Sequence, residues 1–115
     1  MCGRYALYGP ASRLREHFSV ADWPDFGDRY NIAPSLECPV IRLSPQGERV
    51  AHLLRWGLVP HWAKDASIGA RLNNARAESV ASKPSFRAAY RRRRCLIPAS
   101  GYYEWQAVAG ARKQP

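Results

Sequence analysis

Cys2 is the residue whose type and position could do the most specific chemistry in this sequence. Because cysteine is small, we expect Met1 to be trimmed, which leaves Cys2 with a free α-amine beside its thiol. Such an aminothiol condenses with an aldehyde: the amine forms an imine, and the thiolate then adds to the imine carbon to close a thiazolidine ring. Because the thiolate is the attacking form, a nearby cation such as Arg4 would favour the reaction. The start of the chain therefore predicts a nucleophile suited to aldehydes.

The other cysteines and the histidines do not form a recognisable set of metal ligands. Cys38 and Cys95 lie far apart and no C-x-x-C pair is present, so neither a disulfide framework nor a zinc site is expected. Both cysteines lie in apolar stretches and are predicted to be core residues. His17, His52 and His61 are equally scattered. We expect no metal and no cofactor.

The charge of the chain is uneven. Eighteen Lys and Arg against nine Asp and Glu give a net charge of +9, and from Ser67 onward ten basic residues stand against only Glu78 and Glu104. Arginine dominates, and its planar guanidinium binds phosphate oxygens in pairs. A polyanion is the expected partner, with nucleic acid favoured over a membrane because no basic amphipathic helix is evident. The alternatives are a solvated basic surface and an acidic partner.

The length of 115 residues suits one domain, and an apolar content of 46% supports a packed core. No apolar run is long enough to cross a membrane, and the start of the chain does not resemble a secretory signal. We therefore expect no membrane partner. The expected location is the cytoplasm, associated with the nucleoid in a bacterium, or the nucleus in a eukaryote.

Hydrophobic spacing predicts two short helices. Residues 11–20 and 83–94 each place two apolar side chains one helical turn apart, and Ser12 is the expected cap of the first helix. The run Arg91–Arg94 falls at the end of the second helix, where cations suit the helix dipole. We interpret this run as a solvated helix end that adds at most a general attraction to DNA.

The remaining segments predict strands and loops. Residues 38–44 and 48–59 are strand-like and are joined by Pro-Gln-Gly, which indicates a hairpin. Residues 21–35 are rich in Pro and Gly and are predicted to be a loop, and residues 60–73 to be irregular. Residues 95–108 are again strand-like and run into a turn-like end. A hairpin begun without its second strand would leave an open edge, so we expect the front part of one domain.

Several short stretches are denser in Asn, Arg, Glu, Trp and Pro than packing alone requires. They follow "MCGRY" along the chain as "RYNIAP", "RWGLVPHW", "NARAES" and "PASGYYEW". In this combination and order the sequence resembles the SRAP family (SOS response-associated peptidase), whose members recognise abasic sites in single-stranded DNA. The resemblance implies an α+β fold: a strongly bent, barrel-like mixed β-sheet with flanking short helices and a basic groove. It also implies that residues 1–115 are the N-terminal portion of one such domain, because family members are normally longer.

The resemblance implies roles for particular residues. Cys2 matches the residue that captures the aldehyde of the abasic sugar as a thiazolidine, Asn74 a residue beside it, and Glu104 a carboxyl group in proton transfer. Imine formation must expel water, so a neighbouring acid or base is chemically required. The resemblance also implies phosphate contacts and apolar contacts to the bases that flank the missing one. The phosphate-binding positions are Arg4 and Arg76, and the apolar positions are Pro34, Trp56 and Trp62.

Three hypotheses for the function remain open from the sequence. The first is covalent capture of abasic sites through Cys2. The second is a non-catalytic module for single-stranded DNA, which the basic second half and the interleaved aromatic residues favour. The resemblance also implies a further active-site histidine, which none of the three histidines here matches. The third is a peptidase with an N-terminal nucleophile, most simply one that removes its own Met1. The missing half of the domain is expected to come from another segment.

Overall fold

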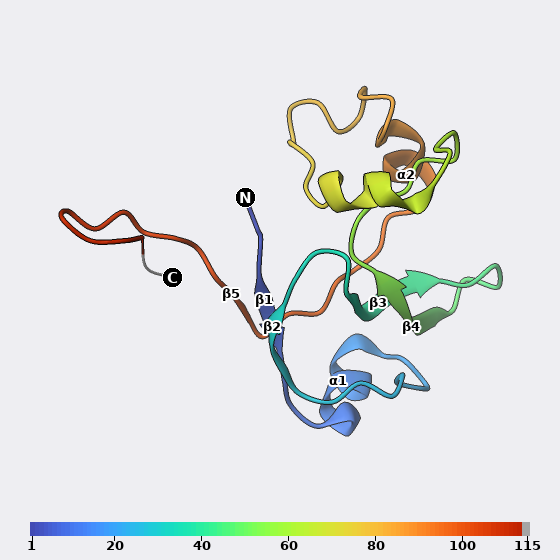
Figure 1. Ribbon diagram of the computed structural model, residues 1–115. Coiled ribbons are helices and arrows are strands. Elements are labelled where there is room, and N and C mark those ends of the chain that lie inside the picture. The colour runs from blue at the N-terminus through green and yellow to red at the C-terminus, as the bar shows by residue number, and fades with distance from the viewer. Residues whose placement is uncertain (114–115) are drawn as a thin grey trace.

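The computed structural model describes residues 1–113, and these residues form two small antiparallel sheets with three short helical segments. The first sheet has the order β2-β1-β5, with β1 (Tyr5–Leu7) in the centre between β2 (Arg29–Ile32) and β5 (Gly101–Tyr102). The second sheet is the hairpin of β3 (Glu37–Leu43) and β4 (Arg49–Arg55). Figure 1 shows the first sheet between the N-terminus and α1, and the hairpin beside it. The predicted α+β class is confirmed.

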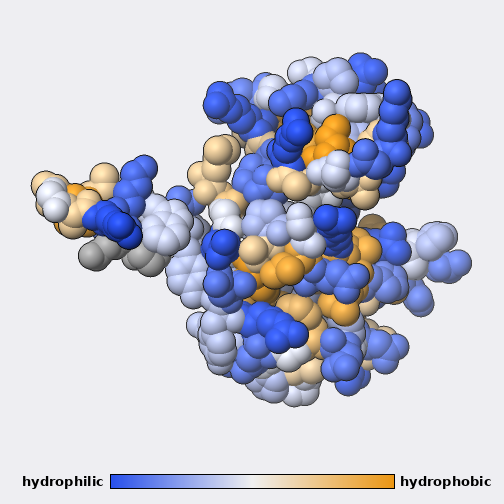
Figure 2. All heavy atoms as spheres, viewed as in Figure 1, coloured by the Kyte–Doolittle hydropathy of each residue, from blue (hydrophilic) through white to orange (hydrophobic). Residues whose placement is uncertain are grey.

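The hydrophobic core lies where the two sheets meet. β1 contributes Tyr5 and Leu7, β2 contributes Ile32, and β3 contributes Cys38 and Val40, and all of these side chains are buried. A backbone bridge between Ile41 of β3 and Leu96 also ties the hairpin to the segment that precedes β5. The short strand β1 pairs with β2 on one edge and with β5 on the other, and its side chains pack against those of β3. This central place fixes the position of the residues just before β1. Figure 2, in the same view as Figure 1, shows apolar surface exposed in the middle of the molecule.

The hairpin at residues 38–44 and 48–59 is confirmed, with β4 ending earlier than predicted, at Arg55. Its turn contains Gly47 with a φ of 81°, a backbone conformation that glycine adopts without strain. The chain then turns sharply at Gly57, whose φ is 132°. A Cβ atom at Gly57 would overlap the carbonyl group of Gly69, so this position allows two backbone segments to touch.

The helices are shorter than the predicted ranges. α1 covers Ala11–Phe18 and α2 covers Arg87–Arg92, and the 3₁₀ helix η1 covers Ala66–Arg71 within the stretch predicted to be irregular. The predicted Ser12 cap is wrong: Pro10 is the N-cap residue, with an extended backbone (φ −65°, ψ 140°), and no side chain caps this end of the helix. The residue that follows α1, Ser19, is its C-cap, and the left-handed backbone of Ser19 (φ 54°) closes the last turn.

Three further predictions of local structure are corrected by the structure. The predicted loop at residues 21–35 contains β2, because Arg29–Ile32 find backbone partners on β1. The predicted strand at residues 95–108 is reduced to single bridge residues at Leu96 and Gln106 and the two residues of β5. Cys95 is exposed and not a core residue, whereas Cys38 is buried as predicted. After β5 the described chain extends away from both sheets (Figure 1).

Candidate active site

Cys2 lies just before β1, and its half-buried side chain packs against the edge of the core. The Cys2 thiol donates a weak hydrogen bond to the carbonyl oxygen of Arg4, with a sulfur–oxygen distance of 3.8 Å. Because Tyr5 and Leu7 anchor β1 in the core, the backbone of Cys2 cannot move far from this position. The fold therefore holds the Cys2 thiol at a defined place near the start of the chain.

Asn74 reaches the same place from a distant part of the sequence. Its side-chain Nδ2 donates a 2.7 Å hydrogen bond to the carbonyl oxygen of Cys2. Two contacts hold the segment that carries Asn74: the indole N–H of Trp56 donates to the carbonyl oxygen of Asn73 (3.0 Å), and the N–H of Leu58 donates to that of Leu72 (3.0 Å). The end of the hairpin thus positions the amide that fixes Cys2.

Glu104 closes the third side, from the segment that follows β5. The backbone N–H of Tyr103 donates to the carbonyl oxygen of Arg4 (2.9 Å), which keeps the next residue close to the N-terminus. A carboxylate oxygen of Glu104 lies 3.6 Å from the α-amine of Met1. Because both groups are largely exposed, this ion pair contributes little to stability. It does place the carboxylate of Glu104 beside the amine of the chain terminus.

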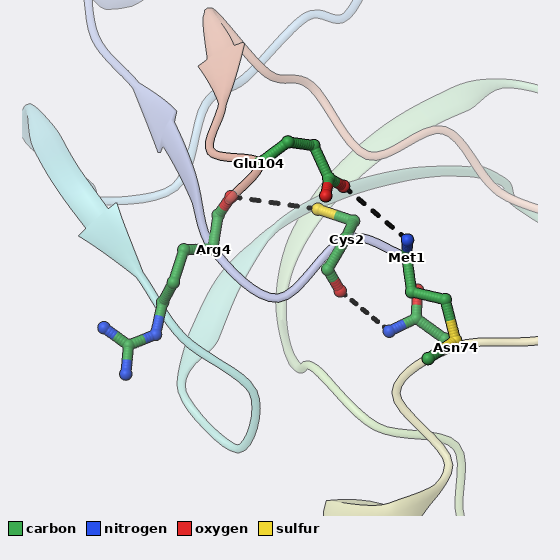
Figure 3. A network of polar contacts seen from close by, with 5 residues as sticks. All are labelled: Met1, Cys2, Arg4, Asn74 and Glu104. Carbon is green, nitrogen blue, oxygen red and sulfur yellow. Dashed lines mark hydrogen bonds and ion pairs between the residues drawn. The ribbon is translucent and has the colours of Figure 1, made fainter. Parts of the chain in front are cut away.

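Figure 3 shows Cys2, Asn74, Glu104 and the Met1 amine converging on one place. A pocket of about 370 Å³ opens there. Its walls come from the N-terminal segment, the hairpin end, the segment after η1 and the region around β5. The lining residues are Cys2, Tyr5, Trp56, Asn73, Asn74, Ile97, Ala99, Tyr102 and Glu104. The structure therefore brings together three residues singled out by the sequence for chemistry, together with Trp56.

Two aromatic rings form the floor of this pocket. Tyr5 and Trp56 meet edge to face, with ring centroids 5.5 Å apart. The Tyr5 hydroxyl is buried and has no hydrogen-bond partner within residues 1–113, and burial, together with the neighbouring Cys38 thiol, raises the pKa of the Tyr5 phenol well above its ordinary range. The hydroxyl is therefore neutral at any pH relevant to the chain. Sequence reasoning missed Tyr5 as a pocket residue; the available signal was the short apolar run Tyr5–Leu7, all of which is buried.

The other residues singled out by the sequence lie outside the pocket lining. The Arg4 guanidinium points away from Cys2 and donates to Asn31 Oδ1 (3.0 Å), so the structure gives no support to the idea that Arg4 favours the thiolate (Figure 3). Arg76 is exposed just beyond Asn74. Pro34 is half-buried and precedes Ser35, whose N–H donates to the carbonyl oxygen of Trp56 (2.8 Å).

The two tryptophans differ in their surroundings. Trp56 is half-buried against the core, while the side chain of Trp62 is 51% exposed and lines a separate hollow beside η1. Trp56 therefore belongs to the pocket itself, and Trp62 presents a free aromatic surface some way from it. Within residues 1–113 no group of three or more His, Cys, Asp or Glu is arranged to hold a metal ion. No helix in this range is long and apolar enough to cross a membrane.

The fold and the pocket define an α+β protein with a fixed cysteine next to its N-terminus. The family model of the SOS response associated peptidase (SRAP) matches residues 1–115, and the chain belongs to this family. The family predicted from the motifs is therefore confirmed.

Comparisons with individual proteins agree with this assignment. The chain is 40% identical over 118 residues to the abasic site processing protein YoqW of Bacillus subtilis, and 31% identical over 139 residues to the abasic site processing protein HMCES of Rattus norvegicus. These alignments include the whole chain but only 52% and 39% of the two relatives. The chain thus spans about half the length, or less, of the curated relatives it matches.

Solved structures support the fold. A crystal structure of a protein from Bordetella bronchiseptica matches 90% of the chain with a TM-score of 0.72 and 27% identity, and the match covers 51% of that protein. A second crystal structure, from Bacteroides thetaiotaomicron, matches 96% of the chain with a TM-score of 0.76, at 22% identity. The arrangement of the two small sheets is therefore found in experimentally solved proteins.

Proposed function

We propose that this chain captures abasic sites in single-stranded DNA through Cys2, once Met1 has been removed. The observation that carries the proposal is the convergence of Cys2, Asn74 and Glu104 in one pocket. The relatives named abasic site processing proteins supply the substrate class. An aldehyde is the reactive group of an opened abasic sugar, and an aminothiol is a group that captures aldehydes without any cofactor.

The proposed reaction forms two bonds and releases one water molecule. The Cys2 amine attacks the aldehyde carbon, and the resulting carbinolamine loses water to give an imine. The Cys2 sulfur then adds to the imine carbon, and the imine nitrogen takes up a proton, which closes the thiazolidine ring. No electrons are exchanged with an oxidant or a reductant. Each proton transfer needs a neighbouring acid or base.

Glu104 is the group best placed for these proton transfers. Its carboxylate already contacts the α-amine of Met1, and removal of Met1 makes the amine of Cys2 the new terminus beside it. The protonated carboxyl group assists the departure of water, and the carboxylate assists the opening of the sugar ring. Asn74 holds the Cys2 carbonyl group, so the new amine and the thiol stay on the pocket side.

The rest of the site suits DNA that lacks a base. An abasic nucleotide offers no base edge, so recognition relies on backbone charge and on stacking with neighbouring bases. The net charge of +9 supplies the attraction for phosphates, and Arg4 and Arg76 are the proposed phosphate contacts. Trp56, Trp62 and Pro34 are the proposed apolar contacts to flanking bases, each stacked base being worth about 1–3 kcal/mol.

The test is an incubation of the 115-residue chain, with Met1 removal confirmed by mass, with a single-stranded oligonucleotide that carries one abasic site. We expect a product that survives a denaturing gel, with the summed mass of both partners less one water, and that is absent in Cys2→Ala. Cys95→Ala is the matched control, because Cys95 is exposed but lies outside the pocket. Salt-dependent binding without any adduct would instead indicate a non-catalytic DNA-binding module.

A second candidate function, removal of its own Met1, is favoured by one observation. Glu104 contacts the Met1 amine while the Cys2 thiol lies directly after the bond to be cut. The test uses chemically synthesised chain that retains Met1, so that no cellular aminopeptidase contributes. Loss of the Met1 mass during incubation, abolished in Cys2→Ala, is the expected result for a self-processing protein. A stable Met1 would contradict it.

A further inference from the structure

Two tyrosine rings stack on the surface of the first sheet, at the end where β1 finishes. Tyr8 directly follows β1 and Tyr30 lies on β2, with ring centroids 5.5 Å apart and an interplanar angle of 27°. The side chains of Tyr8 and Tyr30 are 48% and 60% exposed. The stack therefore leaves large ring areas open to solvent, although both residues lie beside a strand of the core.

Backbone contacts hold this pair in place. The N–H of Tyr8 donates to the hydroxyl oxygen of Ser100 (3.0 Å), and that hydroxyl donates back to the carbonyl oxygen of Tyr8 (3.2 Å). The hydroxyl of Tyr103 donates to the carbonyl oxygen of Tyr30 (2.7 Å). None of these bonds uses a ring of the pair. The rings are thus presented on a fixed backbone, and their removal leaves these anchors intact.

The pair is linked to the region of the Cys2 pocket through Tyr103. Tyr103, which supports Tyr30, also donates its backbone N–H to Arg4 and directly precedes Glu104. From Arg4 to Tyr8 the strand advances four residues, or about 13 Å. A single strand held at the pocket would therefore meet the stacked rings within a few nucleotides.

A hollow beside the pair adds space and positive charge. It has a volume of about 350 Å³ and is lined by Tyr8 together with Arg13, Leu14 and His17 of α1 and neighbouring residues. An acidic group beside the pair, Asp28, accepts hydrogen bonds from the N–H of Gly9 (3.0 Å) and from the Tyr30 hydroxyl (3.4 Å). Its charge lies at the hydroxyl edge, so it disfavours a phosphate there and leaves the ring faces for a base.

We infer that Tyr8 and Tyr30 form a base-stacking subsite for single-stranded DNA on one side of the captured nucleotide. This inference rests on the proposed function for the position of the abasic site. The occupant is a base of the flanking strand, stacked on the exposed ring surface, with its backbone near Arg13. The stack is indifferent to base identity, because every base has a π face.

The experiment compares Tyr30→Leu and Tyr8→Ala with the unchanged chain in fluorescence anisotropy. The strands carry one central abasic site with about eight nucleotides on both sides, or with one side shortened to a single nucleotide. We expect about fivefold or greater loss of affinity in both variants when the side facing the tyrosines is long. We expect no loss when that side is short. Tyr30→Phe keeps the ring and should bind as the unchanged chain does.

Salt and a strand without an abasic site separate this subsite from the covalent chemistry. Stacking releases no counterions, so Tyr30→Leu should leave the slope of log Kd against log salt unchanged, whereas Arg4→Ala should reduce it. An intact strand of the same length reports the subsite even if Cys2 never forms an adduct. Unchanged affinity for long strands, or an equal loss on long and short strands or on both sides, would overturn the inference.

Discussion

The side-chain amide of Asn74 donates a 2.7 Å hydrogen bond to the carbonyl oxygen of Cys2, which joins two residues 72 positions apart in the sequence. This bond makes the terminal cysteine part of the folded domain. Because Asn74 binds the backbone carbonyl group of Cys2, it holds the residue in place without occupying the thiol or the amine.

Replacing Asn74 should slow adduct formation more than it weakens DNA binding. Asn74→Ala removes one hydrogen bond, worth about 0.5–1.5 kcal/mol, and frees the terminal segment, so we expect adduct formation to slow about tenfold. Asn74→Asp should be slower still, because a carboxylate would face the carbonyl oxygen of Cys2. Single-turnover rates on denaturing gels measure both. Gln46→Ala is the control, because this amide is exposed in the hairpin turn and lies outside the pocket lining; a rate as low as that of Asn74→Ala would argue against a specific role.

Replacing Glu104 should affect the chemistry and spare the binding. Glu104→Gln keeps the shape but cannot exchange a proton, so we expect adduct formation about 10²- to 10⁴-fold slower. Affinity for an intact strand should stay equal or rise slightly, because one negative charge is lost. Glu78→Gln removes the other acidic residue of the basic half and should react at the normal rate. Equal rates for Glu104→Gln and the unchanged chain would remove Glu104 from the mechanism.

Gly57→Ala should destabilise the fold and disturb the site together. The φ of 132° is strained for any side chain, and the new Cβ would overlap the Gly69 carbonyl group. We expect a loss of about 1–3 kcal/mol in the free energy of unfolding, measured by urea titration. Because Gly57 follows Trp56, adduct formation should fall as well. Gly27→Ala has open space at its Cβ position and should change neither quantity; a stable Gly57→Ala chain would contradict this close contact.

The stability of the fold should fall in alkaline solution. Cys38 is 1% exposed, its thiol donates to the carbonyl oxygen of Leu54 (3.6 Å), and burial raises the pKa of the Cys38 thiol above its ordinary value of 9.0. Above that value the unfolded chain releases this proton before the folded chain does, so the unfolded state binds fewer protons and stability decreases as pH rises. Urea midpoints measured from about pH 8 to about pH 11 should decline steadily.

Tyr5→Phe tests the same buried region at neutral pH. Within the described residues the Tyr5 hydroxyl has no hydrogen-bond partner, so its removal should leave the free energy of unfolding unchanged or increase it. The alkaline decline should also become smaller, because burial raises the pKa of the Tyr5 phenol as it does that of the Cys38 thiol. Tyr90→Phe, at an exposed position, is the control and should keep the full decline. A loss of more than about 1 kcal/mol in Tyr5→Phe at neutral pH would show a hydrogen bond that the structure lacks.

The sequence by itself determined the hairpin, the approximate places of both α-helices and the residues whose side chains could take part in a reaction. The hairpin follows from alternation and from the Pro-Gln-Gly turn, which are local properties. Cys2, Asn74 and Glu104 stood out through motifs, and the family follows from their order along the chain. The basic second half and the arginine excess are likewise fixed by composition.

Only the tertiary structure decided which of these residues meet. β1 and β2 are strands because each supplies backbone partners to the other, and no pattern within 21–35 announces this pairing. The same pairing buries Tyr5 under Cys2, turns Arg4 toward Asn31, and places Tyr30 against Tyr8. Tertiary packing also leaves Trp62 exposed and makes Trp56 part of the pocket lining. Contacts between distant segments depend on loop closure and on packing, so they are absent from the local signals that a sequence carries.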